Sequence, residues 1–240
     1  MSFRTLLTAG VAAVSLSAVL ASGAMAANIL STTPTWTGTT GGSNIVLNGT
    51  QGVSPDVFTT VRWGVSLGEG QSGLGFDGAQ PPAAVVPTDT NFLLGTLVHY
   101  NNPIAGGSAA TSATLGLAVA VDSASPATQN FSYRFLIDET PNETPCAYPS
   151  VTPCADKITF ENLSSSQAFT IAGQPYTLAV VGFATSIGGA ITDNFISQEG
   201  GTSTAYLYAK LTAPVPEPAS MAILGIGLLG LGFAARRRQA

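Results

Sequence analysis

The sole histidine of the chain, His99, is the first residue to weigh for catalysis. A catalytic dyad needs a carboxylate or a nucleophile beside the imidazole, and the sequence carries no Gly-x-Ser-x-Gly elbow and no His-Glu-x-x-His zinc motif. The Asn101-Asn102-Pro103 that follows is typical of a strand that ends in a turn. We therefore predict that His99 is structural, with a hydrogen bond across the strand end, and that the protein is not an enzyme.

Acidic residues flank the only two cysteines of the chain, and they are Asp138, Glu139, Glu143, Asp156 and Glu161. Loop carboxylates are ligands that Ca²⁺ prefers, and the ion takes six to eight oxygens. The spacing here matches neither an EF-hand loop nor a calcium-binding nonapeptide repeat. We therefore expect solvated carboxylates and no cofactor, with a calcium site as the alternative.

Cys146 and Cys154 lie in a proline-rich segment. An isolated pair in an oxidising compartment usually forms a disulfide, while free or redox-active thiols are the alternative. Closing so short a loop contributes about 2–3 kcal/mol to stability. We predict the disulfide.

Two further features have a structural and a functional interpretation. The glycine-rich stretch 64–78 lacks the Lys-Ser/Thr ending of a phosphate loop, so we predict a flexible loop between strands. A set of aromatic residues offers either a sugar-binding platform or sandwich core, and we expect core. This set is Trp36, Trp63, Phe76, Tyr100 and Tyr148.

The elements that must position these residues are short strands. Runs rich in Val, Ile, Thr, Phe and Tyr alternate with Gly, Pro, Asn and Ser clusters, which predicts an all-β fold. We expect a single β-sandwich, jelly-roll or immunoglobulin-like, over residues 27–213. The predicted strands are 45–48, 58–66, 92–100, 113–121, 131–137, 157–161, 167–171, 176–185 and 204–211, with an edge strand through 35–37.

The first 26 residues have the pattern of a secretory signal peptide. Arg4 precedes an apolar run over 6–20, and Ala24-Met25-Ala26 is a small-x-small cleavage site. A first transmembrane helix is the alternative, but the apolar run is short for a span. We predict export of the residues that follow.

A second apolar run occupies residues 219–235 and carries no charge. As a helix it would be about 25 Å long, near the lower limit for crossing a membrane. Arg236, Arg237 and Arg238 follow it directly and would stay on the cytoplasmic side. We predict a C-terminal transmembrane helix with the β domain outside the cytoplasm; a buried core helix is the alternative.

Pro216, Glu217 and Pro218 stand just before this apolar run. Together with the run and the arginine cluster they make residues 214–240 resemble the PEP-CTERM sorting signal. The resemblance implies that an exosortase, a membrane-embedded transpeptidase, is a processing partner. It also implies an exported precursor, anchored in the inner membrane and facing the periplasm, that later reaches the cell surface or extracellular matrix.

Two motifs in the middle are similar to the THxN family of PEP-CTERM proteins, or to the choice-of-anchor K domain. They are the strand end from His99 to Ile104 and the turn Glu139-Thr-Pro-Asn142 ahead of the cysteines. The resemblance supports fold and sorting, and it assigns no role to the motif positions. These positions are His99, Asn101, Asn102, Glu139, Pro141 and Asn142.

Charge narrows the choice of partners. The formal net charge is −5, and only four basic residues lie between the two tails, so nucleic acid is not an expected partner. We expect a non-catalytic surface or matrix protein associated with exopolysaccharide and biofilm. A carbohydrate- or calcium-binding module is the alternative. A hydrolase that uses His99 and carboxylates the sequence cannot place is the third candidate.

Overall fold

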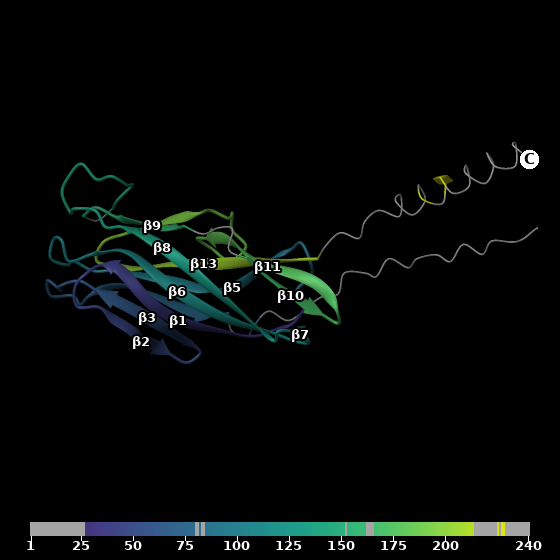
Figure 1. Ribbon diagram of the computed structural model, residues 1–240. Coiled ribbons are helices and arrows are strands. Elements are labelled where there is room, and N and C mark those ends of the chain that lie inside the picture. Colours follow the sequence, from purple (N-terminus) through teal and green to yellow (C-terminus); the bar gives the residue numbers. More distant parts are fainter. Residues whose placement is uncertain are drawn as a thin grey trace, which may run out of the picture. The chain divides into compact units, whose positions relative to one another are not determined.

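The computed structural model describes residues 27–213 apart from 80, 81, 83, 84, 152 and 162–165, together with 225, 227 and 228. All the strands belong to one compact unit, and they form two antiparallel sheets (Figure 1). The predicted all-β class is confirmed for the described part of the chain.

The smaller sheet has five strands in the order β1-β6-β8-β9-β12. Their bounds are β1 Ile29–Gly41, β6 Ala110–Val121, β8 Thr128–Asp138, β9 Asp156–Phe160 and β12 Asn194–Ser197. Strand β8 alternates between buried and more exposed residues. Phe131, Tyr133, Phe135 and Ile137 therefore face the core, as the period of two in the sequence predicts.

The larger sheet has eight strands in the order β2-β3-β4-β5-β13-β11-β10-β7. Their bounds are β2 Val46–Val53, β3 Asp56–Trp63, β4 Ser72–Gly78, β5 Asn91–Asn101, β13 Gly201–Thr212, β11 Gln174–Ala184, β10 Ser166–Ile171 and β7 Ala124–Ser125. Strands β2 to β5 form a meander, and β13 then pairs with β5. Five plus eight strands exceed both the eight-stranded jelly roll and the seven- to nine-stranded immunoglobulin pattern.

One aromatic cluster joins the two sheets. Phe183 of β11 packs against Phe135, Phe160 and Phe195 of the other sheet, with ring centroids 6.0, 5.8 and 5.6 Å apart. These edge and tilted contacts are the favoured geometries for aromatic pairs. The two sheets therefore enclose a single core, as in a β-sandwich.

The structure corrects the predicted elements at several places. Strand β1 runs from Ile29 to Gly41, well beyond the predicted edge strand at 35–37. The short strands β7 and β12 were not predicted. The clearest error concerns 64–78, which was predicted to be a flexible loop but contains the buried strand β4.

The glycines of β4 explain why this stretch resembles a loop in sequence. Gly73 pairs with Arg62 on one side and with Tyr100 on the other. Because Gly73 has no side chain, the Arg62 guanidinium reaches across the strand and lies 3.6 Å from the centre of the Tyr100 ring, a cation–π contact. A Cβ on Gly73 would lie 2.3 Å from the carbonyl oxygen of Val61. Glycine is therefore required by close packing here.

The predicted tails fall almost wholly outside the described residues. The signal peptide at 1–26 lies outside them, as does the 214–240 segment except for Gly225, Gly227 and Leu228, which are helical. Within the part of the chain that the structure describes, no helical segment has the length and apolar character that a membrane crossing requires.

Gly73→Ala should lower the free energy of unfolding by about 2–3 kcal/mol, because the added methyl group overpacks β4 against backbone. Gly38→Ala is the matched control, since a Cβ added at Gly38 would meet nothing within 4 Å. We expect the control to change stability by about 0.5 kcal/mol or less. Denaturant midpoints measure both, and equal midpoints for the two variants would contradict the packing argument.

Candidate metal centre at the end of the sandwich

Three carboxylates far apart in sequence meet at one end of the sandwich. Glu139 directly follows β8, Asp156 begins β9, and Glu199 lies in the turn between β12 and β13. One carboxylate oxygen from each residue lies within 4.8 Å of the other two. The arrangement brings together the acid of the Glu-Thr-Pro-Asn motif and a glutamate some sixty residues later.

Hydrogen bonds orient the Asp156 side chain. The backbone N–H of Thr140 donates to Asp156 Oδ1 at 2.9 Å, and the Thr140 hydroxyl lies 3.3 Å from the same oxygen. The Thr140 hydroxyl also donates to the carbonyl of Ala155 at 3.1 Å. Asp156 is fully buried. These bonds hold one carboxylate oxygen and leave the other free to face the cluster.

A disulfide loop braces the Glu199 turn. Cys146 and Cys154 form the predicted disulfide, with Cα atoms 5.0 Å apart. Inside that loop the N–H of Val151 donates to the Gln198 side chain at 2.9 Å, and the Gln198 amide donates to the carbonyl of Pro149 at 3.2 Å. These bonds fix the disulfide loop, which precedes Asp156, against the turn that carries Glu199.

Several buried oxygens in this region accept or donate no hydrogen bond within the described chain. They are Glu139 Oε2, Asp156 Oδ2, both Glu199 oxygens, Asn101 Oδ1 and Ser197 Oγ. Ser197 is the ladder partner of Asp156, so the two side chains stand on the same face of the sheet. The Asn101 amide donates to the Ser197 carbonyl at 3.0 Å, which places Asn101 beside them. Buried polar groups are normally satisfied, so this concentration needs an explanation.

Crowding and burial make the charged forms of these acids costly. Two unit charges 4.8 Å apart repel by about 3.5 kcal/mol at an effective dielectric constant of about 20. Burial, together with the charges of Asp156 and Glu199, raises the pKa of Glu139 to about 8. Burial, with the charge of Glu199, raises the pKa of Asp156 to about 7, although the Thr140 hydrogen bonds oppose this. Burial also raises the pKa of Glu199.

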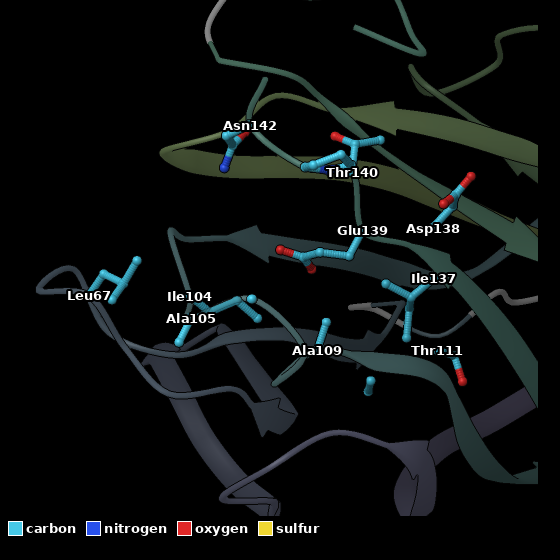
Figure 2. A pocket seen from close by; sticks show the side chains of 14 residues that line it. Leu67, Ile104, Ala105, Ala109, Thr111, Ile137, Asp138, Glu139, Thr140 and Asn142 are labelled. Atoms are coloured by element: carbon cyan, nitrogen blue, oxygen red, sulfur yellow. The ribbon is translucent and has the colours of Figure 1, made fainter. Parts of the chain in front are cut away.

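A pocket of about 730 Å³ opens beside the cluster. Figure 2 shows the Glu139 side chain projecting into it from the segment after β8, while the Asp138 side chain points away. Ile104, Ala109 and neighbouring small residues form the opposite wall. Glu139 thus belongs to both the pocket and the cluster, and it connects the buried acids with solvent.

The carboxylates that the sequence singled out divide into two groups. Only Glu139 and Asp156 join the cluster. Asp138 instead accepts a hydrogen bond from the Tyr148 hydroxyl, and Glu161 pairs with Arg134 at 3.3 Å. Glu143 is exposed.

Sequence reasoning missed Glu199. It sits in Gln198-Glu199-Gly200-Gly201, a glycine-containing turn whose preceding strand β12 was also missed. The available signal was an acid in a tight turn. That signal does not show which residues lie opposite the turn in the fold.

His99 lies in the core, away from any role in proton transfer with solvent. It is fully buried, and burial together with the Arg62 charge lowers its pKa to about 3, so the ring is neutral. Its ring stacks on Trp63 with centroids 6.2 Å apart. The predicted hydrogen bond across the strand end is wrong, because neither ring nitrogen has a partner among the described residues. The ring is instead held by packing.

The remaining motif positions have different surroundings. Asn102 bonds to the start of β4. Its backbone N–H donates to the Ser72 hydroxyl at 3.2 Å, and its side-chain amide donates to the Gln71 carbonyl at 3.0 Å. Pro141 and Asn142 line the pocket. Four of the five aromatic residues lie in the core as expected, because Trp36, Trp63, Phe76 and Tyr100 are buried, and only Tyr148 is half-exposed.

Comparison with known proteins identifies the C-terminal tail. Residues 214–238 match the PEP-CTERM protein-sorting motif, as the sequence predicts. This motif indicates an exported, exosortase-sorted protein whose precursor is membrane-anchored before cleavage. No curated protein matches the chain.

In a divalent-free buffer the stability of the chain should fall as the pH rises from about 4.5 to about 8. Over this range the folded chain holds protons on Glu139 and Asp156 that the unfolded chain has lost, so stability decreases with pH. Asp156→Asn should flatten this slope while keeping the acceptor for Thr140. Melting temperatures across the pH range, with exposed Glu143→Gln as control, check this; a slope unchanged in Asp156→Asn would contradict it.

Replacing Cys146 and Cys154 by serine together should lower the free energy of unfolding by about 2–3 kcal/mol, the loop-closure contribution of so short a bridge. Denaturant unfolding measures the loss. A reducing agent should destabilise the natural chain by a similar amount and leave the double variant unaffected. A double variant as stable as the natural chain would show that the bridge contributes nothing.

Proposed function

We propose that this chain is a non-catalytic surface or matrix protein that an exosortase releases into an exopolysaccharide-rich environment. The single observation that carries the proposal is the sorting motif at residues 214–238. A tail of this kind delivers a domain to the outside of the cell and does not itself perform chemistry. The β-sandwich would then be the delivered part.

Burial of the sole histidine supports the non-catalytic role. His99 is neutral and enclosed, so it cannot exchange protons with a substrate in water. A low charge density and a polar β-rich surface suit a protein that acts by association in a hydrated polymer layer. The hydrolase alternative loses His99 and would have to rest on carboxylates alone.

The THxN or choice-of-anchor K assignment is part of the proposal. The two motifs, at the strand end with His99 and at the turn with Glu139, meet in space. Asn101 donates to the carbonyl of Ser197, and Ser197 pairs with Asp156. Asp156 in turn lies next to Glu139. Such convergence supports the view that the two segments form one structural unit.

A binding module is the second candidate function, and the pocket with Glu139 on its wall favours it. A carbohydrate ligand would need exposed aromatic or hydrogen-bonding groups, and the main aromatic side chains are buried. Calcium is better supported than a sugar, because the buried oxygens form a suitable set of donors.

Replacing Pro216, Glu217 and Pro218 by alanine together should block processing in the native host. The variant should stay in the membrane fraction at precursor size, as should the natural chain in a strain without its exosortase. Ala213→Ser, just ahead of the matched segment, is the control and should be processed normally. Fractionation with immunoblotting measures size and location. Unchanged size and location in the exosortase-free strain would overturn the sorting proposal.

A further inference from the structure

The end of the sandwich holds more buried oxygens than the described donors satisfy. Asp156, Ser197 and Asn101 have no exposed surface, and each keeps an oxygen without a hydrogen-bond partner among the described residues. Glu199 is also buried and contributes two more such oxygens. Among the described residues, no ion pair with a lysine or arginine offsets the charges of Glu139, Asp156 and Glu199.

We propose that Glu139, Asp156 and Glu199 bind one calcium ion at this end of the sandwich. One carboxylate oxygen of each already lies within 4.8 Å of the other two. Small side-chain adjustments would bring each of these oxygens to within 2.3–2.6 Å of a shared Ca²⁺, the usual calcium–oxygen distance. A bound cation would remove the repulsion among the three acids.

Two neutral oxygens, Ser197 Oγ and Asn101 Oδ1, distinguish this group from a simple cluster of acids. Ser197 stands on the same sheet face as Asp156, and Asn101 is tied to the Ser197 carbonyl by its amide. This bond turns the Asn101 nitrogen toward the backbone and leaves its oxygen unpaired. With two hydroxyl or amide oxygens beside three carboxylates, the donors approach the six to eight that Ca²⁺ takes, and water would supply the rest.

The kind of donor atom in the group, all oxygen, favours calcium over zinc or magnesium. Zinc sites in proteins use mainly cysteine and histidine, and here both cysteines are in the disulfide and His99 is outside the group. Magnesium demands octahedral geometry and keeps several waters, which a buried cluster of long side chains serves poorly. A flexible set of oxygens from three separate segments suits Ca²⁺.

Entry is available through the pocket. Glu139 is the least buried of the three acids, and it lines the pocket while its carboxylate reaches the cluster. The ion would couple the segment after β8, the start of β9 and the β12–β13 turn. Calcium would therefore rigidify the part of the sandwich where the two sequence motifs meet, whichever sorting route the tail follows.

The test uses the purified intact chain in mild detergent, stripped of metal and then titrated with CaCl₂. Ca²⁺ at about a hundredfold excess over its dissociation constant should raise the melting temperature by about 5–10 °C, and a chelator should reverse the rise. Equilibrium dialysis with elemental analysis should find a single bound Ca²⁺. MgCl₂ at the same concentration should give a much smaller shift.

Asp156→Asn and Glu199→Gln give the decisive comparison. Without metal near neutral pH each should melt at a higher temperature than the natural chain, because one charge of the crowded group is gone. Each should also lose most of the calcium shift, whereas Glu143→Gln, an exposed acid of the same loop, should keep it. Having two neutralised variants guards against one that fails to fold.

Three results would overturn the proposal. The first is a natural chain that shows neither a thermal shift nor bound metal. The second is a shift that persists in both neutralised variants, which would place the ion elsewhere. The third is an equal shift with Mg²⁺, which would exclude a calcium-selective site.

Discussion

Repulsion among three crowded carboxylates is the constraint around which one end of this sandwich is organised. Glu139, Asp156 and Glu199 come from three separate segments, and contacts other than charge hold two of them in place. The Thr140 hydrogen bonds hold Asp156, and the disulfide loop with Gln198 braces the turn of Glu199. Packing and backbone hydrogen bonding thus oppose the mutual repulsion of these acids.

The rest of the sandwich supplies the rigidity that such a site needs. Phe183 and its aromatic partners join the two sheets through the core, and the glycines of β4 allow Arg62 to stack on Tyr100 across the neighbouring strand. Both features depend on close contact between neighbouring strands or facing sheets. Because a tightly packed interior deforms little, the ends of the strands keep their side chains in place.

The two parts of the protein carry different kinds of information. The tail is identified by a local pattern, a short motif followed by an apolar run and arginines, and the family comparison recovers it at 214–238. The candidate site in the sandwich depends instead on side chains from three separate segments. The sorting motif and the proposed calcium ligands therefore involve separate residues, and the tail can be altered without touching those ligands.

The sequence by itself determined the properties that depend on near neighbours. These are the all-β class, the alternation of β8, the disulfide of Cys146 with Cys154 and the sorting motif, because strand periodicity, loop closure and a linear motif all act over short stretches. Only the tertiary structure decided that 64–78 contains a buried strand, that His99 is enclosed by Trp63, and that Glu199 joins Glu139 and Asp156. Those outcomes depend on which strands pair across the sheets, and pairing partners are set by long-range packing that no local pattern records.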